Sequence, residues 1–209
     1  MTGRNPAFLL APGAGAPSSH PRMQAFARGF AALGPVVAFD YPYMREGRRR
    51  PDPLPALIAA HRAALAALRA GHDGPVVLVG KSMGGRVGCH VALVEPVAAV
   101  ICLGYPLCGA GDRTKLRDQV LVDLRVPALF VQGTRDPLCP LDLLAGVRAR
   151  MRAPSDLCVV DDADHSLIVG KRALRERGKS QADVDRDWFS SVPAFLSGIG
   201  APDKGGLSP

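Results

Sequence analysis

Short apolar runs recur along the chain and predict the strands of a sheet. They lie at residues 7–11, 36–39, 76–79, 97–103, 128–131 and 157–160. Most of these runs are continuously hydrophobic and do not alternate with polar residues, which is typical of strands that are buried on both faces. The pattern therefore predicts a sheet of about six strands inside the molecule.

The segments between these runs carry helical periodicity, which indicates the fold class. A helix is expected at residues 53–70, where one stripe is apolar and consists of Leu54, Leu57, Ile58, Leu65 and Leu68. His61 falls on this stripe, and we expect it to pack in the core. A further helix is expected to begin at Ser180 with a capping box to Asp183, and to end or kink at Pro193. Alternation of such strands and helices predicts an α/β fold, with helices on both faces of a mostly parallel sheet.

The length of the chain favours a single domain. A chain of 209 residues can bury a sizeable core but is short for two domains of ordinary size. The sequence has no internal repeat and no Pro/Gly-rich linker between its apolar runs. We expect one domain over residues 1–198 and a disordered tail over residues 199–209, where Gly and Pro are frequent.

The formal net charge of +7 raises the question of a nucleic-acid partner. Basic residues cluster at Arg45 and at 48–50, but Pro51 and Pro53 flank this run and no aromatic residues are interleaved with it. Such a run is typical of a solvated loop. We therefore expect no nucleic-acid partner.

The apolar segments are too short for a membrane protein. The longest run, residues 97–103, is far below the roughly 18 residues that a spanning helix needs. Near the N-terminus, the run 7–11 stops at Pro12 and Gly13, so the hydrophobic region of a secretory signal is missing. These features predict no membrane contact and a cytoplasmic location.

The five cysteines do not form the patterns of structural sites. Their number is odd, none belongs to a CxxC pair, and none has zinc-ligand spacing to a histidine. We expect neither disulfides nor a metal site.

The candidate nucleophile is Ser82, in a glycine-rich segment that directly follows the run 76–79. Residues 80–85 read Gly-Lys-Ser-Met-Gly-Gly and satisfy the G-x-S-x-G pattern. The motif lies between a predicted buried strand and a predicted helix over residues 83–94, which is where a sharp elbow raises a serine hydroxyl above a sheet. A phosphate-binding loop is the alternative, but the required G-x-x-x-x-G-K-[ST] spacing is absent. We expect Lys81 to be solvated or salt-bridged.

A serine hydroxyl needs a base, and the base needs a third group that orients it. Asp136 follows the run that ends at Val131, and His165 follows the run that ends at Val160. We predict that His165 is the general base and that Asp136 orients it. Three further aspartates lie near the histidine. Asp164 is its direct neighbour in the chain, so its carboxylate is expected to point away from the imidazole. Asp161 and Asp162 are expected to shape the loop.

The remaining site residues are predicted from their position around the elbow. The backbone N–H groups of Met83 and Ala14 are expected to form an oxyanion hole. Four residues are candidates for the walls of a substrate pocket, with plain packing as the alternative for each: Tyr43, Met44, Tyr105 and Leu107. The segment 104–125 is too short for a cap domain, so we expect an open site.

Several of these motifs together resemble a known family. The segments 10–15, 39–44, 80–86, 104–107, 133–136 and 164–166 are similar to those of the small dienelactone-hydrolase-like branch of the α/β-hydrolases, of the testis-expressed protein 30 type. Pro12 stands where that family usually has histidine. The resemblance covers about residues 7–197 and implies an α/β-hydrolase fold without the first two strands of the full sheet, and without a cofactor. Dienelactone hydrolases use a cysteine where this chain has Ser82, so their substrate is not transferred.

Two functions from different classes remain open at this point. The first is a serine hydrolase, a carboxylesterase or thioesterase, which transfers an acyl group from a small-molecule ester to water. The second is a non-catalytic domain that uses the same fold to bind a partner or serve as a scaffold. The intact set of Ser82, Asp136 and His165 favours the enzyme. The sequence does not distinguish a monomer from a homodimer.

Overall fold

The computed structural model describes residues 5–199 and shows one sheet of six parallel strands. The strand order is β2-β1-β3-β4-β5-β6, and every neighbouring pair is parallel. The strands are β1 (Ala7–Ala11), β2 (Val36–Ala38), β3 (Val76–Lys81), β4 (Ala99–Leu103), β5 (Ala128–Gly133) and β6 (Ser155–Val160). The predicted α/β class and the predicted number of strands are confirmed.

Burial separates the central strands from the two edge strands. Every residue of β1, β3, β4 and β5 is buried, as their continuous apolar runs predict. The edge strands differ, because each has a neighbour on one side only: Val37 of β2 is 40% exposed and Val159 of β6 is 42% exposed. Burial on both faces, expected for most of the runs, is thus found in the four central strands and not in β2 and β6.

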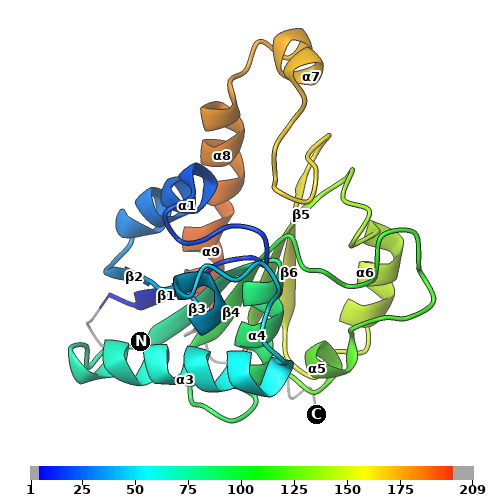
Figure 1. Ribbon diagram of the computed structural model, residues 1–209. Helices are drawn as coiled ribbons and strands as arrows, with labels where there is room; N and C mark the ends of the chain where they lie inside the picture. Colours follow the sequence, from blue (N-terminus) through cyan, green and yellow to red (C-terminus); the bar gives the residue numbers. More distant parts are fainter. Residues whose placement is uncertain (1–4, 200–209) are drawn as a thin grey trace, which may run out of the picture.

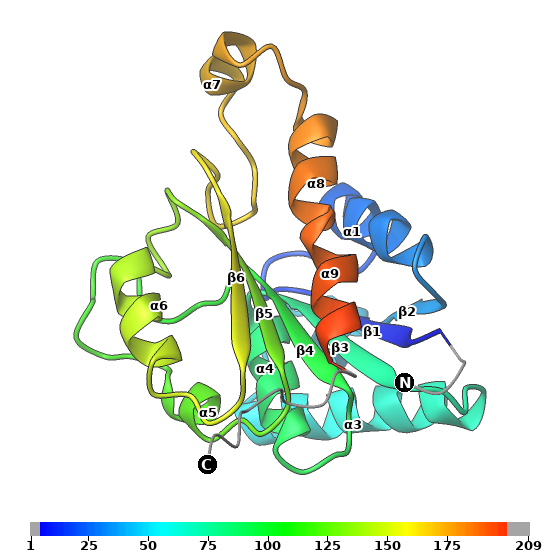
Figure 2. The ribbon, with the colours of Figure 1, turned by 180° about the vertical axis from the view of Figure 1, so that it is seen from behind.

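Helices cover both faces of the sheet (Figures 1 and 2). The helices α1 (Pro21–Ala31), α8 (Gln181–Phe189) and α9 (Ser191–Gly198) pack on one face. The opposite face is covered by α3 (Leu54–Ala70), α4 (Met83–Ala92), α5 (Gln119–Val122) and α6 (Leu141–Arg148). Alternate residues of a strand serve the two faces, so that Phe8 packs with α1 and Leu9 packs with α3.

Two short helices lie outside these layers. The first, α2 (Pro42–Arg45), follows β2 and buries Tyr43. The second, α7 (Lys171–Glu176), buries none of its residues and projects away from the sheet in both views (Figures 1 and 2). Neither helix forms a cap domain, and the segment between β4 and β5 packs Tyr105, Leu121 and Leu124 into the core.

The C-terminal helix pair follows the predicted signals. Ser180 caps α8, and the reciprocal bonds with Asp183 form the expected capping box. The helix ends at Phe189 and α9 begins at Ser191. This break agrees with Pro193, whose missing N–H cannot bond to the carbonyl four residues earlier. Ile199, the first residue of the predicted tail, packs against the core, and the rest of that tail, residues 200–209, lies outside the described residues.

His61 of α3 is fully buried, as its place on the apolar stripe predicts. The Tyr41 hydroxyl lies 3.2 Å from His61 Nδ1, while His61 Nε2 is buried without a hydrogen-bond partner. Burial lowers the pKa of His61 from 6.5 to about 3, because the charged imidazole is poorly solvated there. His61 is therefore neutral in the folded protein.

This buried histidine predicts a loss of stability in acid. The folded pKa lies below the unfolded value, so the contribution is fully present above about pH 6.5 and is lost as the pH falls toward 3. Each pH unit within this range should remove about 1.4 kcal/mol from the free energy of unfolding. Urea unfolding between pH 7.5 and 4.5 should show a weaker pH dependence for His61→Leu than for the wild-type protein. Equal slopes for the two proteins would contradict this assignment.

Among residues 5–199, no helix combines the length and the hydrophobicity that crossing a bilayer requires.

Candidate active site

Ser82 occupies a sharp turn between β3 and α4. It is the N-cap residue of α4, with φ of 51° and ψ of −116°, in the half of backbone space that favours glycine. Its N–H donates to the Leu103 carbonyl of β4 at 3.1 Å. The turn also needs glycines: a Cβ on Gly80 would lie 2.1 Å from the Gly85 nitrogen, and a Cβ on Gly84 would lie 2.5 Å from the Ala11 carbonyl oxygen. This is the elbow that the G-x-S-x-G motif predicts.

The structure brings Ser82, His165 and Asp136 into one hydrogen-bonded row. The Ser82 Oγ lies 2.7 Å from His165 Nε2, and His165 Nδ1 lies 2.7 Å from Asp136 Oδ2. The three residues follow β3, β5 and β6 at the carboxyl ends of the strands, and β5 pairs directly with β6. The row is consistent with Nδ1 donating to the carboxylate, which leaves Nε2 free to accept from the serine hydroxyl.

Asp136 is buried and held in its ionised form. Its Oδ2 also accepts from Gln132 Nε2 at 2.5 Å, and its Oδ1 accepts from the Leu138 N–H at 2.8 Å. Burial alone would raise the pKa of Asp136, but the hydrogen bond and charge of His165, with those from Leu138 and Gln132, hold it below its usual value. Asp136 is therefore a carboxylate at neutral pH.

Gln132 was not found from the sequence. It is fully buried, and its Oε1 accepts from the Tyr105 N–H at 3.1 Å while its amide group donates to Asp136. The available signal was a polar residue at the end of an otherwise apolar strand, since a buried polar side chain needs hydrogen-bond partners.

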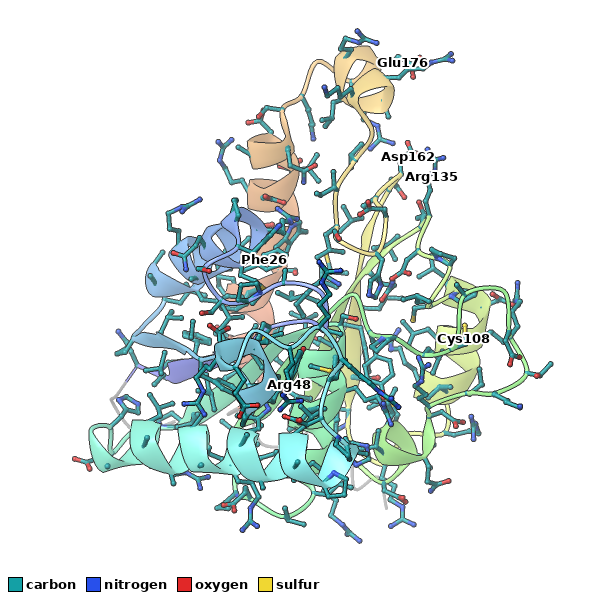
Figure 3. The ribbon with its side chains drawn as sticks, viewed as in Figure 1. Phe26, Arg48, Cys108, Arg135, Asp162 and Glu176 are labelled. Carbon is teal, nitrogen blue, oxygen red and sulfur yellow. The ribbon has the colours of Figure 1, made fainter. Side chains whose placement is uncertain are left out.

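The loops that carry Asp136 and His165 are joined to each other. The Asp162 N–H donates to Thr134 Oγ1 at 2.8 Å, and the Arg135 N–H donates to the Ala163 carbonyl at 2.9 Å. Arg135 and Asp162 accordingly lie close together at the tips of these loops (Figure 3). A Cβ on Gly133 would lie 2.2 Å from the Ala163 carbonyl oxygen, so this close approach requires glycine. These contacts fix the distance between the acid and the histidine.

The other aspartates near His165 shape its loop. Asp164 Oδ1 accepts from the Ser166 N–H at 2.7 Å and from the Ile168 N–H at 3.0 Å. Asp162 forms an ion pair with Arg177. Asp136, and neither of these two, is the carboxylate bonded to the histidine.

With this geometry, comparison with known proteins identifies the family. A family model described as an alpha/beta hydrolase domain matches residues 4–193. The chain belongs to this family. The α/β-hydrolase fold expected from the motifs is therefore confirmed.

The relatives of this α/β-hydrolase are distant. Its fold is similar to that of an alpha-beta serine hydrolase homologue from Coxiella burnetii, at 17% identity over 90% of this chain and 86% of that one, with a TM-score of 0.71. It is also similar to a dienelactone hydrolase from Anabaena variabilis, at 19% identity over 91% and 88%, with a TM-score of 0.63. The Protein sumv-2 of Caenorhabditis elegans is 28% identical over 105 residues, which are 50% of this chain but 9% of that protein. This hydrolase thus matches a small part of the length of that relative.

The loop after β1 lies against the elbow of the hydrolase. A Cβ on Gly13 would lie 3.5 Å from Ser82 Cβ, and Ala14 lines the same cavity as Ser82. The Tyr43 hydroxyl donates to the Ala14 carbonyl at 3.0 Å and so fixes the orientation of that peptide. Met83 is the first residue of α4, where N–H groups have no acceptor inside the helix. The oxyanion role of Ala14 and Met83 stays a prediction.

A cavity of about 450 Å³ opens in front of Ser82. This volume is within the usual range for small-molecule sites. Its walls consist of Gly13, Ala14, Gly15, Ala16, His20, Arg22, Met23, Lys81, Ser82, Leu138, His165 and Ser166. Across residues 5–199, no three His, Cys, Asp or Glu side chains are grouped as a set of metal ligands.

Two of the predicted pocket walls are core residues instead. Tyr105 and Leu107 are fully buried and absent from the walls of the Ser82 cavity. The positive φ of Gly104, 66°, turns the chain inward after β4. The Tyr105 ring then packs against Phe130, and its hydroxyl donates to the Arg117 carbonyl at 2.8 Å. The prediction of Tyr105 and Leu107 as pocket walls was wrong.

The other two predicted walls, Tyr43 and Met44, line a neighbouring hollow. This hollow shares residues 14–16 with the Ser82 cavity and extends to Arg48 and Arg49. Tyr43 and Met44 are therefore separated from Ser82 by the loop after β1, and they do not line the Ser82 cavity itself.

The N-terminal part of α1 provides a further wall of the cavity, which was not predicted from the sequence. Arg22 donates from Nε to the Ser166 carbonyl and from Nη2 to the Leu167 carbonyl, both at 2.9 Å, and forms an ion pair with Asp185 of α8. His20 caps α1 by accepting from the Arg22 N–H. These contacts tie α1 to the loop after His165, a tertiary arrangement that has no signal in local sequence.

Lys81 also differs from its prediction. It is 8% exposed, and within residues 5–199 it forms no ion pair or hydrogen bond with its ammonium group. As the last residue of β3 it points into the protein, so the expectation of a solvated or salt-bridged lysine was wrong.

Proposed function

We propose that this chain is a serine hydrolase, a carboxylesterase or thioesterase that acts on small ester-type substrates. The observation that carries the proposal is the row of two 2.7 Å contacts from Ser82 through His165 to Asp136, with Ser82 on a strand-to-helix elbow. A serine, a base and an orienting acid at these distances form the arrangement that activates a serine hydroxyl.

In the proposed mechanism, His165 Nε2 takes the proton of the Ser82 hydroxyl as Oγ attacks the substrate carbonyl carbon. The carbonyl oxygen becomes an oxyanion, which the N–H groups of Ala14 and Met83 stabilise. The tetrahedral intermediate collapses, His165 gives its proton to the departing alcohol or thiol, and an acyl group remains on Ser82. Water, deprotonated by His165, then attacks this acyl group. The bond to Ser82 Oγ breaks, His165 gives the proton to Oγ, and the acid product leaves.

The contacts of Asp136 support its proposed role as the acid that orients and stabilises His165. Asp136 keeps its negative charge because three hydrogen bonds stabilise it, so it can stabilise the imidazolium that forms when His165 takes a proton. Asp136 also fixes the imidazole in the tautomer that presents an acceptor to Ser82.

A fluorophosphonate probe tests the proposal directly, because it reacts with an activated serine. The wild-type protein should be labelled at Ser82, at one site per chain, as measured by intact mass and peptide mapping. His165→Ala should abolish the labelling, because the hydroxyl then has no base, whereas His20→Ala in the same cavity should keep it. Absence of labelling in a folded wild-type protein would favour a non-catalytic binding domain.

A further inference from the structure

A buried cation beside the nucleophile is not used by the proposed mechanism. Lys81 directly precedes Ser82, lines the same cavity and is 8% exposed. A Cβ on Gly13 would lie 3.5 Å from Lys81 Cγ, and a Cβ on Gly104 would lie 3.4 Å from Lys81 Nζ and 3.5 Å from His165 Nδ1. The stem of Lys81 therefore passes the loop after β1, and its ammonium group lies beside Gly104, which His165 also contacts.

The acidic groups near Lys81 use their oxygens elsewhere. Asp136 and Asp164 both attract its charge, but neither forms an ion pair with it. The Asp136 oxygens accept from His165, Gln132 and Leu138, and Asp164 Oδ1 accepts from two backbone N–H groups. Within residues 5–199 the three N–H bonds of the Lys81 ammonium thus have no protein acceptor.

The other strong cation of the cavity is already neutralised. Arg22 forms an ion pair with Asp185 and donates its remaining hydrogen bonds to the Ser166 and Leu167 carbonyls. Among the described residues that line the cavity there is no Asp or Glu. Among the cavity residues, the cation of Lys81 is consequently the one that has no direct ion pair or hydrogen bond within residues 5–199.

Lys81 is a nearly buried side chain in the wall of the cavity, and an acceptor on a bound ligand would stabilise its ammonium group. We propose that Lys81 binds a carboxylate of the substrate, so that this hydrolase acts on short esters that carry one free carboxylate group. The inference rests on the proposed function, since it names the substrate class of the Ser82 site. One unpaired cation fits a single negative charge, and a cavity of about 450 Å³ fits a short molecule.

The charge state of Lys81 adds a pH signature. Burial lowers the pKa of Lys81 to about 8, against the opposing attraction of Asp136 and Asp164, and Arg22 lowers it further. Lys81 is therefore mostly charged at pH 7 and mostly neutral at pH 9.5. A carboxylate on the substrate stays ionised over this whole range. The preference of the enzyme for esters that carry a carboxylate should therefore decline as the pH rises through 8.

The test compares matched esters that differ in one charge. Monoethyl malonate, succinate and glutarate are paired with the ethyl esters of the corresponding half-amides, and ethanol release is measured at pH 7. The wild-type enzyme should show a kcat/KM at least about tenfold higher for the half-ester than for the half-amide at the best chain length, as expected for a charge-assisted hydrogen bond. This ratio should fall at pH 9.5.

Three variants test whether Lys81 causes the preference for the half-ester. Lys81→Met should bring the ratio close to one, and Lys81→Arg should keep part of it. Lys171→Met, which removes a lysine from the projecting helix α7, should leave the ratio unchanged. Because the readout is a ratio within one protein, a partial loss of folding changes both esters equally.

Three results would overturn the proposal. Equal rates on both esters by the wild-type enzyme would refute the inference while leaving the proposed function intact. A preference that persists in Lys81→Met would place the anion at another group. Failure to hydrolyse any ester, with no fluorophosphonate labelling, would refute the proposed function and the inference with it.

Discussion

Replacing Ser82 with alanine is expected to lower kcat for a short ester by about 10⁴ to 10⁶. The Oγ atom is the proposed nucleophile, and no other hydroxyl in the described part of the chain lies against His165 Nε2. The variant should remain folded, because alanine removes one atom and Ser82 makes no side-chain cap bond to α4. Steady-state hydrolysis and circular dichroism measure the two effects separately.

The matched control is Ser166→Ala. Ser166 lines the same cavity, but it forms its hydrogen bonds through its backbone: its N–H donates to Asp164 and its carbonyl accepts from Arg22. This variant should keep its kcat within about threefold of the wild-type value. If Ser82→Ala keeps even a tenth of the wild-type turnover, the serine mechanism is wrong.

Asp136→Asn is expected to lower kcat by about 10⁴, as the equivalent change does in a serine protease triad. The carboxylate accepts from His165, Gln132 and Leu138, all of which are donors in the present arrangement. An asparagine offers one acceptor oxygen and one NH₂ group, so at least one donor would face another donor. His165 would then favour the tautomer that cannot accept from Ser82. Ester hydrolysis measured over a pH range checks this result.

Asp164→Asn provides the comparison, because it changes the same functional group next to His165. Asp164 Oδ1 accepts from two backbone N–H groups, and an asparagine oxygen can accept both of them. We expect a loss of less than about tenfold. If Asp164→Asn lowers kcat strongly while Asp136→Asn lowers it little, Asp136 is not the acid that orients His165.

The strands and the row of Ser82, His165 and Asp136 could be predicted because local sequence marks both the strands and the residues that follow them. Continuous apolar runs locate β1, β3, β4 and β5, since burial on both faces leaves no polar alternation. A parallel sheet places the residues that follow its strands at one edge. Ser82, Asp136 and His165 therefore meet even though 83 positions separate the serine from the histidine.

The walls of the cavity could not be predicted because they depend on how separate elements pack. Tyr105 follows β4 just as Asp136 follows β5, but the turn at Gly104 directs it into the core. Arg22 reaches the site through bonds to the loop after His165 and to α8. Neither arrangement is encoded in a motif, since each is set by contacts between segments far apart in the chain.

The backbone of Ser82 also has a thermodynamic consequence. A non-glycine residue held at φ of 51° and ψ of −116° costs on the order of 1–3 kcal/mol, while a domain of this kind is stable by about 5–15 kcal/mol. The backbone conformation of this one residue thus lowers the free energy of unfolding by an appreciable fraction. Glycine at this position would relax the backbone while removing the hydroxyl, so stability and the proposed catalytic role favour different residues at position 82.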